Sequence, residues 1–199
     1  MSRPRHFLIL FAGCFLVLVS HGKSLRELSI GRSEFGYRFS GGVDAKVAGI
    51  DYDAAYHSIF LGYRLPFRPF GKDLSRVTWD TSFDLSVLSS DGAPLAGSRM
   101  GLRTGAGYEY LILQQWLLKL DLGINLAKVS SKSRATTLPE ESSWAFGGHM
   151  EASVFYSPHP RFTAFMGFGL ESFGSQDFAD VGIDSGASPT FSTGIVFPW

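Results

Sequence analysis

A two-residue alternation of large apolar side chains with small or polar ones runs through most of this chain between Val77 and Trp199. In its first clear instance, residues 77–87, Trp79 and Phe83 share one parity and Asp80 and Asp84 the other. Successive side chains of a strand point to opposite faces, so a period of two indicates β-structure. Five later segments repeat the pattern without a charge on the apolar parity, as expected if that face meets hydrocarbon. The pattern predicts a transmembrane β-barrel.

Eight alternating segments are predicted, and they lie near residues 30–40, 54–66, 77–87, 102–110, 118–126, 144–156, 162–171 and 191–199. Even strand counts are the rule for bacterial single-chain barrels. We therefore expect an all-β fold, an eight-stranded antiparallel up-and-down transmembrane β-barrel. Polar segments between the strands predict a Gly-rich loop carrying Asp44, Asp51 and Asp53, and further loops at 89–98 and 130–142. The longer loops would face outward, with both chain ends in the periplasm.

The N-terminus reads as a secretory signal peptide, residues 1–22, which leaves residues 23–199 as one barrel domain. Two basic residues precede an apolar stretch that is too short for a membrane-spanning helix. The single cysteine, Cys14, lies in that stretch, so we expect no thiol in the mature chain, and lipidation of Cys14 is the alternative. The mature chain keeps 16 basic and 18 acidic residues, a charge of −2, which gives no indication of nucleic-acid binding.

Eight aromatic residues from seven strands or turns fall near the same predicted height, at the periplasmic rim. Amphipathic rings prefer the interface between membrane and water, so this set predicts an aromatic girdle. Its members are Tyr63, Trp79, Tyr110, Trp116, Tyr156, Phe162, Phe197 and Trp199.

A soluble periplasmic barrel that binds a ligand would show the same period with the faces exchanged. The glycines favour the membrane alternative, because they lie on the polar parity, where a solvated surface would instead favour strand-forming polar residues. A narrow eight-stranded lumen needs such small residues opposite long ones. These glycines are Gly105, Gly107, Gly123, Gly147, Gly167, Gly169 and Gly194.

The exported chain, the eight alternating segments and the aromatic ending Phe197 to Trp199 resemble the small outer-membrane barrels of the OmpA and OmpX type. The likeness covers nearly the whole mature chain but depends on pattern rather than on a diagnostic motif. It implies an outer-membrane location, contact with outer-membrane lipid and lipopolysaccharide, and a C-terminal strand that the barrel-assembly machinery reads. It also implies that the peptidoglycan-binding domain of longer OmpA-like proteins is absent.

Charged residues of both signs are predicted to point into the lumen, where an unpaired charge costs several kcal/mol. We interpret them as a structural network that closes the lumen, and a gated ion path is the alternative. The predicted network comprises Arg38, Asp80, Asp84, Arg103, Glu109, Lys119, Asp121, Glu151 and Glu171, with Glu34, Arg64 and His149 on the same faces.

His149, Glu151 and Ser153 share one face of the sixth segment, and hydrolases assemble a base, an orienting group and a nucleophile from such residues. Some eight-stranded lipid A deacylases use a His, Ser and Glu site. Their His-x-Ser pattern is missing here and their site faces lipid, whereas these residues are predicted to face inward. Positions two apart on a strand are about 7 Å apart, so we expect no direct hydrogen bond along the strand unless long side chains bend.

His57 and three aspartates of the last predicted loop are the remaining candidate residues. His57 is expected at the outer rim of the lipid face, opposite in direction to Ser58. Asp177, Asp180 and Asp184 lack the spacing of a calcium loop and predict a solvated acidic loop, with no metal or other cofactor.

We expect a structural or surface-interaction barrel that acts through its outer loops on an unknown ligand. A lipid A-modifying hydrolase and a soluble ligand-binding barrel stay open as alternatives.

Overall fold

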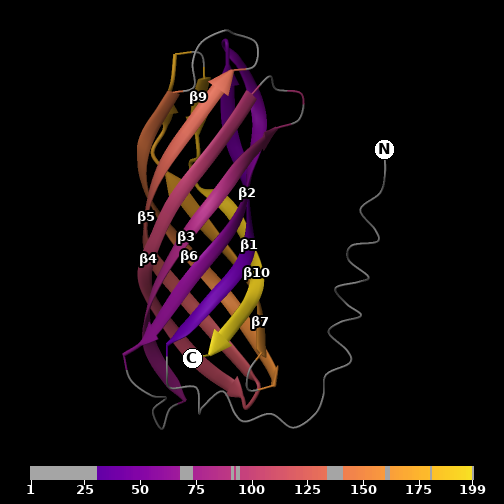
Figure 1. Ribbon diagram of the computed structural model, residues 1–199, viewed down its shortest axis with the longest axis vertical. Helices are drawn as coiled ribbons and strands as arrows, with labels where there is room; N and C mark the ends of the chain where they lie inside the picture. The colour runs from indigo at the N-terminus through magenta and orange to yellow at the C-terminus, as the bar shows by residue number, and fades with distance from the viewer. Residues whose placement is uncertain are drawn as a thin grey trace, which may run out of the picture.

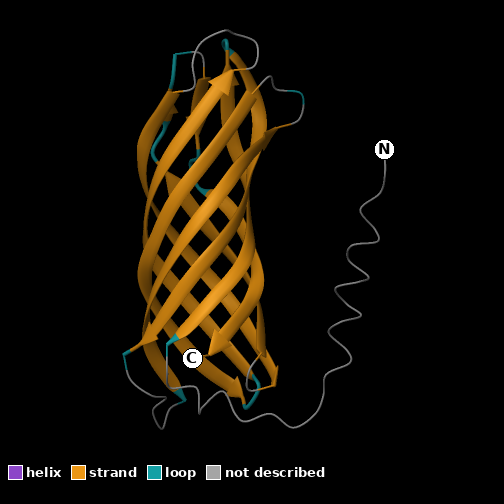
Figure 2. Cartoon of the chain, in the orientation of Figure 1, coloured by secondary structure: helices purple, strands orange, loops and turns teal. Residues whose placement is uncertain are grey.

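The computed structural model describes residues 31–67, 74–90, 92, 95–133, 141–159, 162–179 and 181–198. The predicted signal peptide and Cys14 lie outside these ranges. Every regular element in the described part of the chain is a strand (Figure 2). No helix in these ranges has the length and apolar character needed to cross a membrane.

Eight long strands and two short ones follow one another in the described ranges. The long strands are β1 (Arg32–Val47), β2 (Ile50–Pro66), β3 (Ser75–Ser90), β4 (Leu95–Leu113), β5 (Trp116–Ser133), β6 (Glu141–His159), β7 (Phe162–Phe173) and β10 (Ser188–Pro198). The short strands are β8 (Gln176–Asp177) and β9 (Val181–Asp184).

The long strands form a closed antiparallel barrel (Figure 1). Each pairs with its neighbour in sequence from β1 to β7, β10 pairs with β7, and β10 also pairs with β1, with Phe35 opposite Ile195. Arg32 pairs with Pro198, so the first and last strands begin and finish at one end of the barrel, which we call the terminal end. The opposite end is the loop end. The predicted eight-stranded up-and-down barrel is confirmed.

The apolar parity faces outward over the terminal-end half of the wall. Leu120 and Phe168 have exposed fractions of 53% and 68%, whereas the neighbouring carboxylates Asp121 and Glu171 lie inside with side chains at most 8% exposed. This is the arrangement of a wall that meets hydrocarbon, because a barrel in water would bury its apolar face.

The strands extend further toward the loop end than the sequence pattern predicted. Asp44, Asp51 and Asp53 lie on strands rather than in a Gly-rich loop, because β1 and β2 continue to a turn at Ala48 and Gly49, both with positive φ. The predicted loops at 89–98 and 130–142 are shortened in the same way, by the ends of β3 to β6.

A β-bulge in β1 reverses the two faces of that strand. The pairing with β2 shifts between Ser40 and Val43, where Gly42 has a φ of 67°. One extra residue changes which parity points inward. Beyond the bulge Val43 and Ala45 are therefore buried, and Asp44 is exposed. The loop-end section of the barrel has a polar exterior and an apolar interior.

The last predicted loop contributes to this interior instead of being only a solvated acidic segment. Strand β9 pairs with the part of β1 beyond the bulge, where β10 no longer reaches, and buries Val181 and Ile183. These side chains belong to an apolar cluster at the loop end, made of Val43, Ala45, Val47, Ala54, Tyr56, Leu95, Ala127, Val129, Ala145, Phe173, Val181 and Ile183. A second cluster lies toward the terminal end and contains Phe60, Leu111, Leu117, Phe155, Phe165 and Val196.

Candidate functional site

The lumen contains equal numbers of basic and acidic side chains among the described residues. Inward parity on several strands brings them together, although they are far apart in sequence. The seven basic residues are Arg32, Arg38, Arg64, Arg76, Arg99, Arg103 and Lys119. The seven carboxylates are Glu34, Asp80, Asp84, Glu109, Asp121, Glu151 and Glu171. Balanced charge is what a low-dielectric interior requires, because a surplus charge there is expensive.

Arg64 is the centre of the group nearer the terminal end. Its guanidinium pairs with Glu34, with Asp80 at 2.8 Å and with Glu109 at 2.6 Å. The same group lies over the ring of Phe155, 4.5 Å from the ring centre. Glu109 also accepts a hydrogen bond of 2.5 Å from Arg76. With its side chain 1% exposed, Arg64 forms ion pairs with three carboxylates that come from three other strands.

A second group lies nearer the loop end. Arg38 donates to Asp84 at 2.6 Å, and Glu171 accepts from Ser40 at 2.5 Å and from Arg99 at 3.0 Å. Arg99 joins this group to the loop-end apolar cluster, because its guanidinium lies 4.4 Å from the Tyr56 ring centre and 4.6 Å from that of Phe173.

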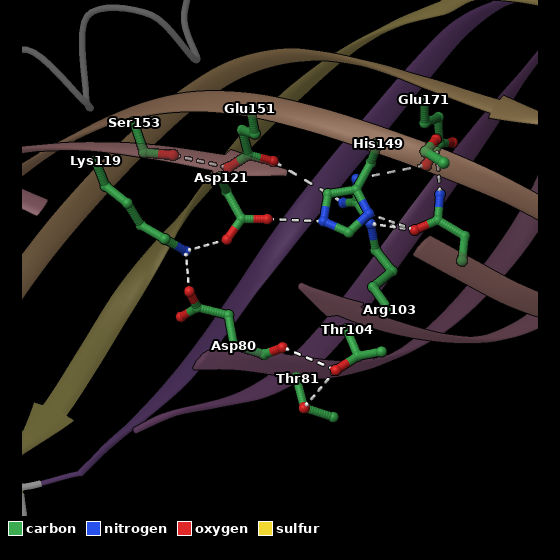
Figure 3. A network of polar contacts seen from close by, with 12 residues as sticks. Asp80, Thr81, Arg103, Thr104, Lys119, Asp121, His149, Glu151, Ser153 and Glu171 are labelled. Atoms are coloured by element: carbon green, nitrogen blue, oxygen red, sulfur yellow. Dashed lines mark hydrogen bonds and ion pairs between the residues drawn. The ribbon is translucent and has the colours of Figure 1, made fainter. Parts of the chain in front are cut away.

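Lys119, Asp121 and His149 connect the two groups (Figure 3). Lys119 Nζ lies 3.1 Å from Asp80 and 3.0 Å from Asp121. His149 Nε2 lies 2.7 Å from Asp121 Oδ1, and its Nδ1 lies 2.6 Å from Asn125 Oδ1. Lys119 reaches across β4 to Asp80 of β3, whereas His149 meets Asp121 and Asn125 of the adjacent strand β5.

The predicted catalytic candidates do not assemble as a nucleophile and its base. Ser153 Oγ donates to Glu151 at 2.8 Å, and both ring nitrogens of His149 lie against Asp121 and Asn125. Ser153 and Glu151 are the case allowed for in the sequence argument, in which a long side chain bridges two positions of one strand. Glu151 also accepts from Ser192 at 2.8 Å.

The open space among these side chains is small. A lumen cavity of about 40 Å³ is lined by Arg64, Asp80, Arg103, Lys119 and Glu151 among others. One water molecule needs at least about 10–15 Å³ measured in this way, so the cavity holds a few waters at most. It has no room for a drug-sized or nucleotide-sized ligand, which occupies at least about 300 Å³.

The sequence argument missed Arg32, Arg76 and Arg99 as inward residues, although parity contains the signal. Each lies an even number of positions from an inward charge of its own strand: Arg32 precedes Glu34, Arg76 precedes Asp80, and Arg99 precedes Arg103. Arg32 already lies in the predicted segment 30–40, and extending the alternation by a few residues would have included Arg76 and Arg99.

The described members of the predicted girdle lie at the terminal end of the barrel. Tyr63 is opposite Ser33, Trp116 is opposite Tyr156, and Phe197 is also opposite Ser33. The rings of Trp116 and Tyr156 are in contact, with centres 4.6 Å apart. Members that are exposed on the outer face include Tyr63, Trp79, Tyr110, Phe162 and Phe197. Trp199 lies outside the described residues.

Two minor candidates can also be placed. His57 lies on the outer face, where its Nδ1 is 2.5 Å from the Tyr37 hydroxyl and its ring meets the Phe39 ring edge-on. Asp177 lies on β8 and Asp184 on β9, both exposed, and Asp180 lies outside the described ranges. Within those ranges, no three His, Cys, Asp or Glu side chains are grouped so as to hold a metal ion.

Comparison with known proteins gives a fold relationship. No protein-family model matches the chain, and no curated protein matches its sequence. Neisserial surface protein A, NspA, superposes with a TM-score of 0.56 at 14% identity, over 85% of this chain and 97% of that one. OprG, an outer membrane protein from Pseudomonas aeruginosa, superposes with a TM-score of 0.52 at 12% identity, over 88% of this chain and 96% of that one. The resemblance to small outer-membrane barrels is confirmed at the level of the fold, and with the apolar exterior it supports an outer-membrane location.

Proposed function

We propose that this protein is an integral outer-membrane barrel whose lumen is closed by the charged network and which acts through its loop end. The observation that carries the proposal is the filled interior: a cavity of about 40 Å³ is surrounded by ion pairs whose side chains are almost wholly buried. Moving an ion through it would require several of these pairs to separate without water to replace them.

Planar-bilayer recordings on the refolded barrel test this proposal. We expect no conductance steps from the wild-type protein. A Lys46→Gln variant serves as a control for charge, because Lys46 is exposed at the loop end and outside the lumen. Reproducible single-channel steps, altered by Arg103→Gln but not by Lys46→Gln, would contradict closure and favour the gated ion path.

The loop end is a rigid surface suited to an interaction role. Spanning strands of a membrane barrel need about 9–11 residues, whereas β4 and β6 have 19 each. The excess forms the section with a polar exterior and an apolar interior, and this section would stand above the outer leaflet. Recognition is commonly placed on segments that a rigid scaffold positions in this way.

The proposed orientation has a direct test, because the mature chain is expected to have no cysteine of its own. Lys46→Cys should react with a membrane-impermeant maleimide on intact cells. Gln114→Cys, in the turn at the terminal end, should react only after the outer membrane is opened. The reverse pattern of labelling would overturn the orientation.

The C-terminal strand has a proposed partner in the barrel-assembly machinery. Strand β10 places Phe191 and Phe197 on the outward parity and closes the barrel against β1. We expect Phe197→Ala to lower the amount of folded protein in the outer membrane while leaving refolding of the purified chain unchanged. An equal loss in both assays would assign Phe197 to stability instead.

A further inference from the structure

The lipid-facing surface of β5, β6 and β7 contains a groove that is separate from the lumen cavity. It is a largely open depression of about 280 Å³, lined mainly by apolar groups that include Leu122, Met150 and Leu170, with Gly148 and Ser172 also in its lining. For scale, an apolar cavity of about 150 Å³ is large enough for a benzene ring. The groove is therefore large enough for part of an acyl chain.

The groove exists because an outward position of β6 carries no side chain. Gly148 lies between Ile124 of β5 and Ser172 of β7. A Cβ atom there would meet only the carbonyl oxygen of Gly123, at 3.5 Å, which is ordinary van der Waals contact. By contrast, a Cβ at the inward Gly123 would lie 2.6 Å from the His149 ring. Packing explains the glycine at 123 and does not explain the one at 148.

The side chains around this gap are unusually exposed. Phe146, Leu122 and Ile124 have exposed fractions of 73%, 69% and 67%. Leu120, which shares the outer face of β5 with Leu122 and Ile124, is 53% exposed. Of these three, Leu122 lines the groove together with Met150 and Leu170, so an inserted chain would bury apolar area on several side chains at once.

A cation and an indole lie above the groove, toward the loop end. Lys128 of β5 and Trp144 of β6 are direct cross-strand neighbours, and both are exposed on the outer face. Trp144 is four residues from Gly148 along β6, or about 13 Å at the rise of an antiparallel strand. Tryptophan and lysine at this height are typical of the headgroup region of a membrane.

We propose that this groove and the Lys128–Trp144 pair form a binding site for one outer-leaflet lipid with an anionic, phosphorylated head group. Lys128 attracts the phosphate, the Trp144 indole N–H is a further donor at the same height, and one acyl chain descends past Phe146 into the gap at Gly148. The site rests on the membrane orientation proposed above but is independent of lumen closure. Conductance steps in bilayer recordings would contradict lumen closure without affecting the lipid site, and a lack of lipid binding would contradict the lipid site without affecting lumen closure.

Native mass spectrometry of the refolded full-length barrel in detergent, titrated with bisphosphorylated lipid A, tests the site. The decisive variant is Gly148→Leu, which fills the groove, and Gly148→Ala is the milder version in case the larger side chain hinders refolding. Ala164→Leu is the matched control, because it adds the same kind of bulk to the outer face of β7 at the terminal end.

We expect wild type and Ala164→Leu to hold one lipid A with equal affinity and Gly148→Leu to bind at least five-fold more weakly. Lys128→Gln should weaken lipid A to a similar extent and leave binding of an uncharged diacylglycerol unchanged, whereas Gly148→Leu should weaken both. Equal binding by wild type, Gly148→Leu and Lys128→Gln would overturn the proposal. Loss of binding in Ala164→Leu would overturn it as well, because the lipid would then not be localised to the groove.

Discussion

Replacing Arg64 by methionine tests the energetic role of the lumen network most severely. The substitution keeps much of the side-chain volume over the Phe155 ring but removes one positive charge from three carboxylates. Asp80 would keep Lys119 at 3.1 Å, and Glu109 would keep Arg76 at 2.5 Å. Glu34 has its ion pair with Arg64 itself, so we expect that carboxylate to lose the most.

Breaking a buried ion pair by removing one partner costs about 3–5 kcal/mol. That corresponds to a decrease of roughly 10²–10⁴-fold in the folding equilibrium constant. In urea, where small proteins lose about 1–3 kcal/mol of stability per molar, the unfolding midpoint should fall by about 1 M or more. Reversible urea unfolding of the refolded barrel in lipid vesicles, followed by tryptophan fluorescence, measures the shift.

Two further variants make the Arg64 result interpretable. Arg64→Met combined with Glu34→Gln restores charge balance and should recover at least about half of the loss, because neutral replacement of a buried pair is far cheaper than leaving one charge unpaired. Lys46→Met removes an exposed pair with Asp51, 3.8 Å apart, and should cost at most about 1 kcal/mol. A loss in Arg64→Met no larger than that in Lys46→Met would refute the reasoning.

Three other substitutions, one of them with a matched control, have defined outcomes. Gly105→Ala should destabilise the barrel by about 1–3 kcal/mol through overpacking, because the added Cβ atom would lie 2.7 Å from Gly123 Cα. An unchanged urea midpoint would contradict this close approach. Gly42→Ala should lower the free energy of unfolding by about 1–2 kcal/mol, because residue 42 has a φ of 67°, which disfavours a Cβ atom. It should also increase protease cleavage near the bulge. Unaltered cleavage and stability would argue against the bulge. Arg99→Met should lower the free energy of unfolding by about 3 kcal/mol, because Glu171 loses its 3.0 Å ion pair. Ser98→Ala, at an exposed position of the same strand, is the control and should cost almost nothing. Equal losses in the two variants would remove Arg99 from the network.

The terminal-end half of the barrel was predictable because one rule governs it. Side chains alternate along most of each strand there, and the register shifts on β4 and β6 lie at the strand ends, near Leu113 and His159. Leu120 and Asp121 therefore reveal their faces from sequence alone. The same parity gave the inward position of Glu109 and Lys119. It could not give their partners, because Arg64, Asp80 and Lys119 meet through register between strands, which depends on the whole barrel.

The loop-end section was not predictable by the same rule. The bulge near Gly42 reverses the parity of β1, so Val43 and Ala45 do not continue the outward series of Phe35 and Phe39. Aspartates that alternate with small apolar residues there look like a loop when hydrocarbon is assumed outside. The pairing of β9 with β1 joins segments more than 130 residues apart and has no local signal.

The central claim is that apolar side chains face lipid over one part of the wall and that this pattern reverses beyond the bulge. Spin labels placed one at a time along β1 in the reconstituted barrel test it most directly, through their accessibility to oxygen and to a water-soluble nickel chelate. We predict that labels at Phe35 and Phe39 are accessible to oxygen, whereas labels at Asp44 and Lys46 are accessible to the nickel chelate. A label at Phe35 that is shielded from oxygen, or one at Asp44 that meets lipid, would contradict the account.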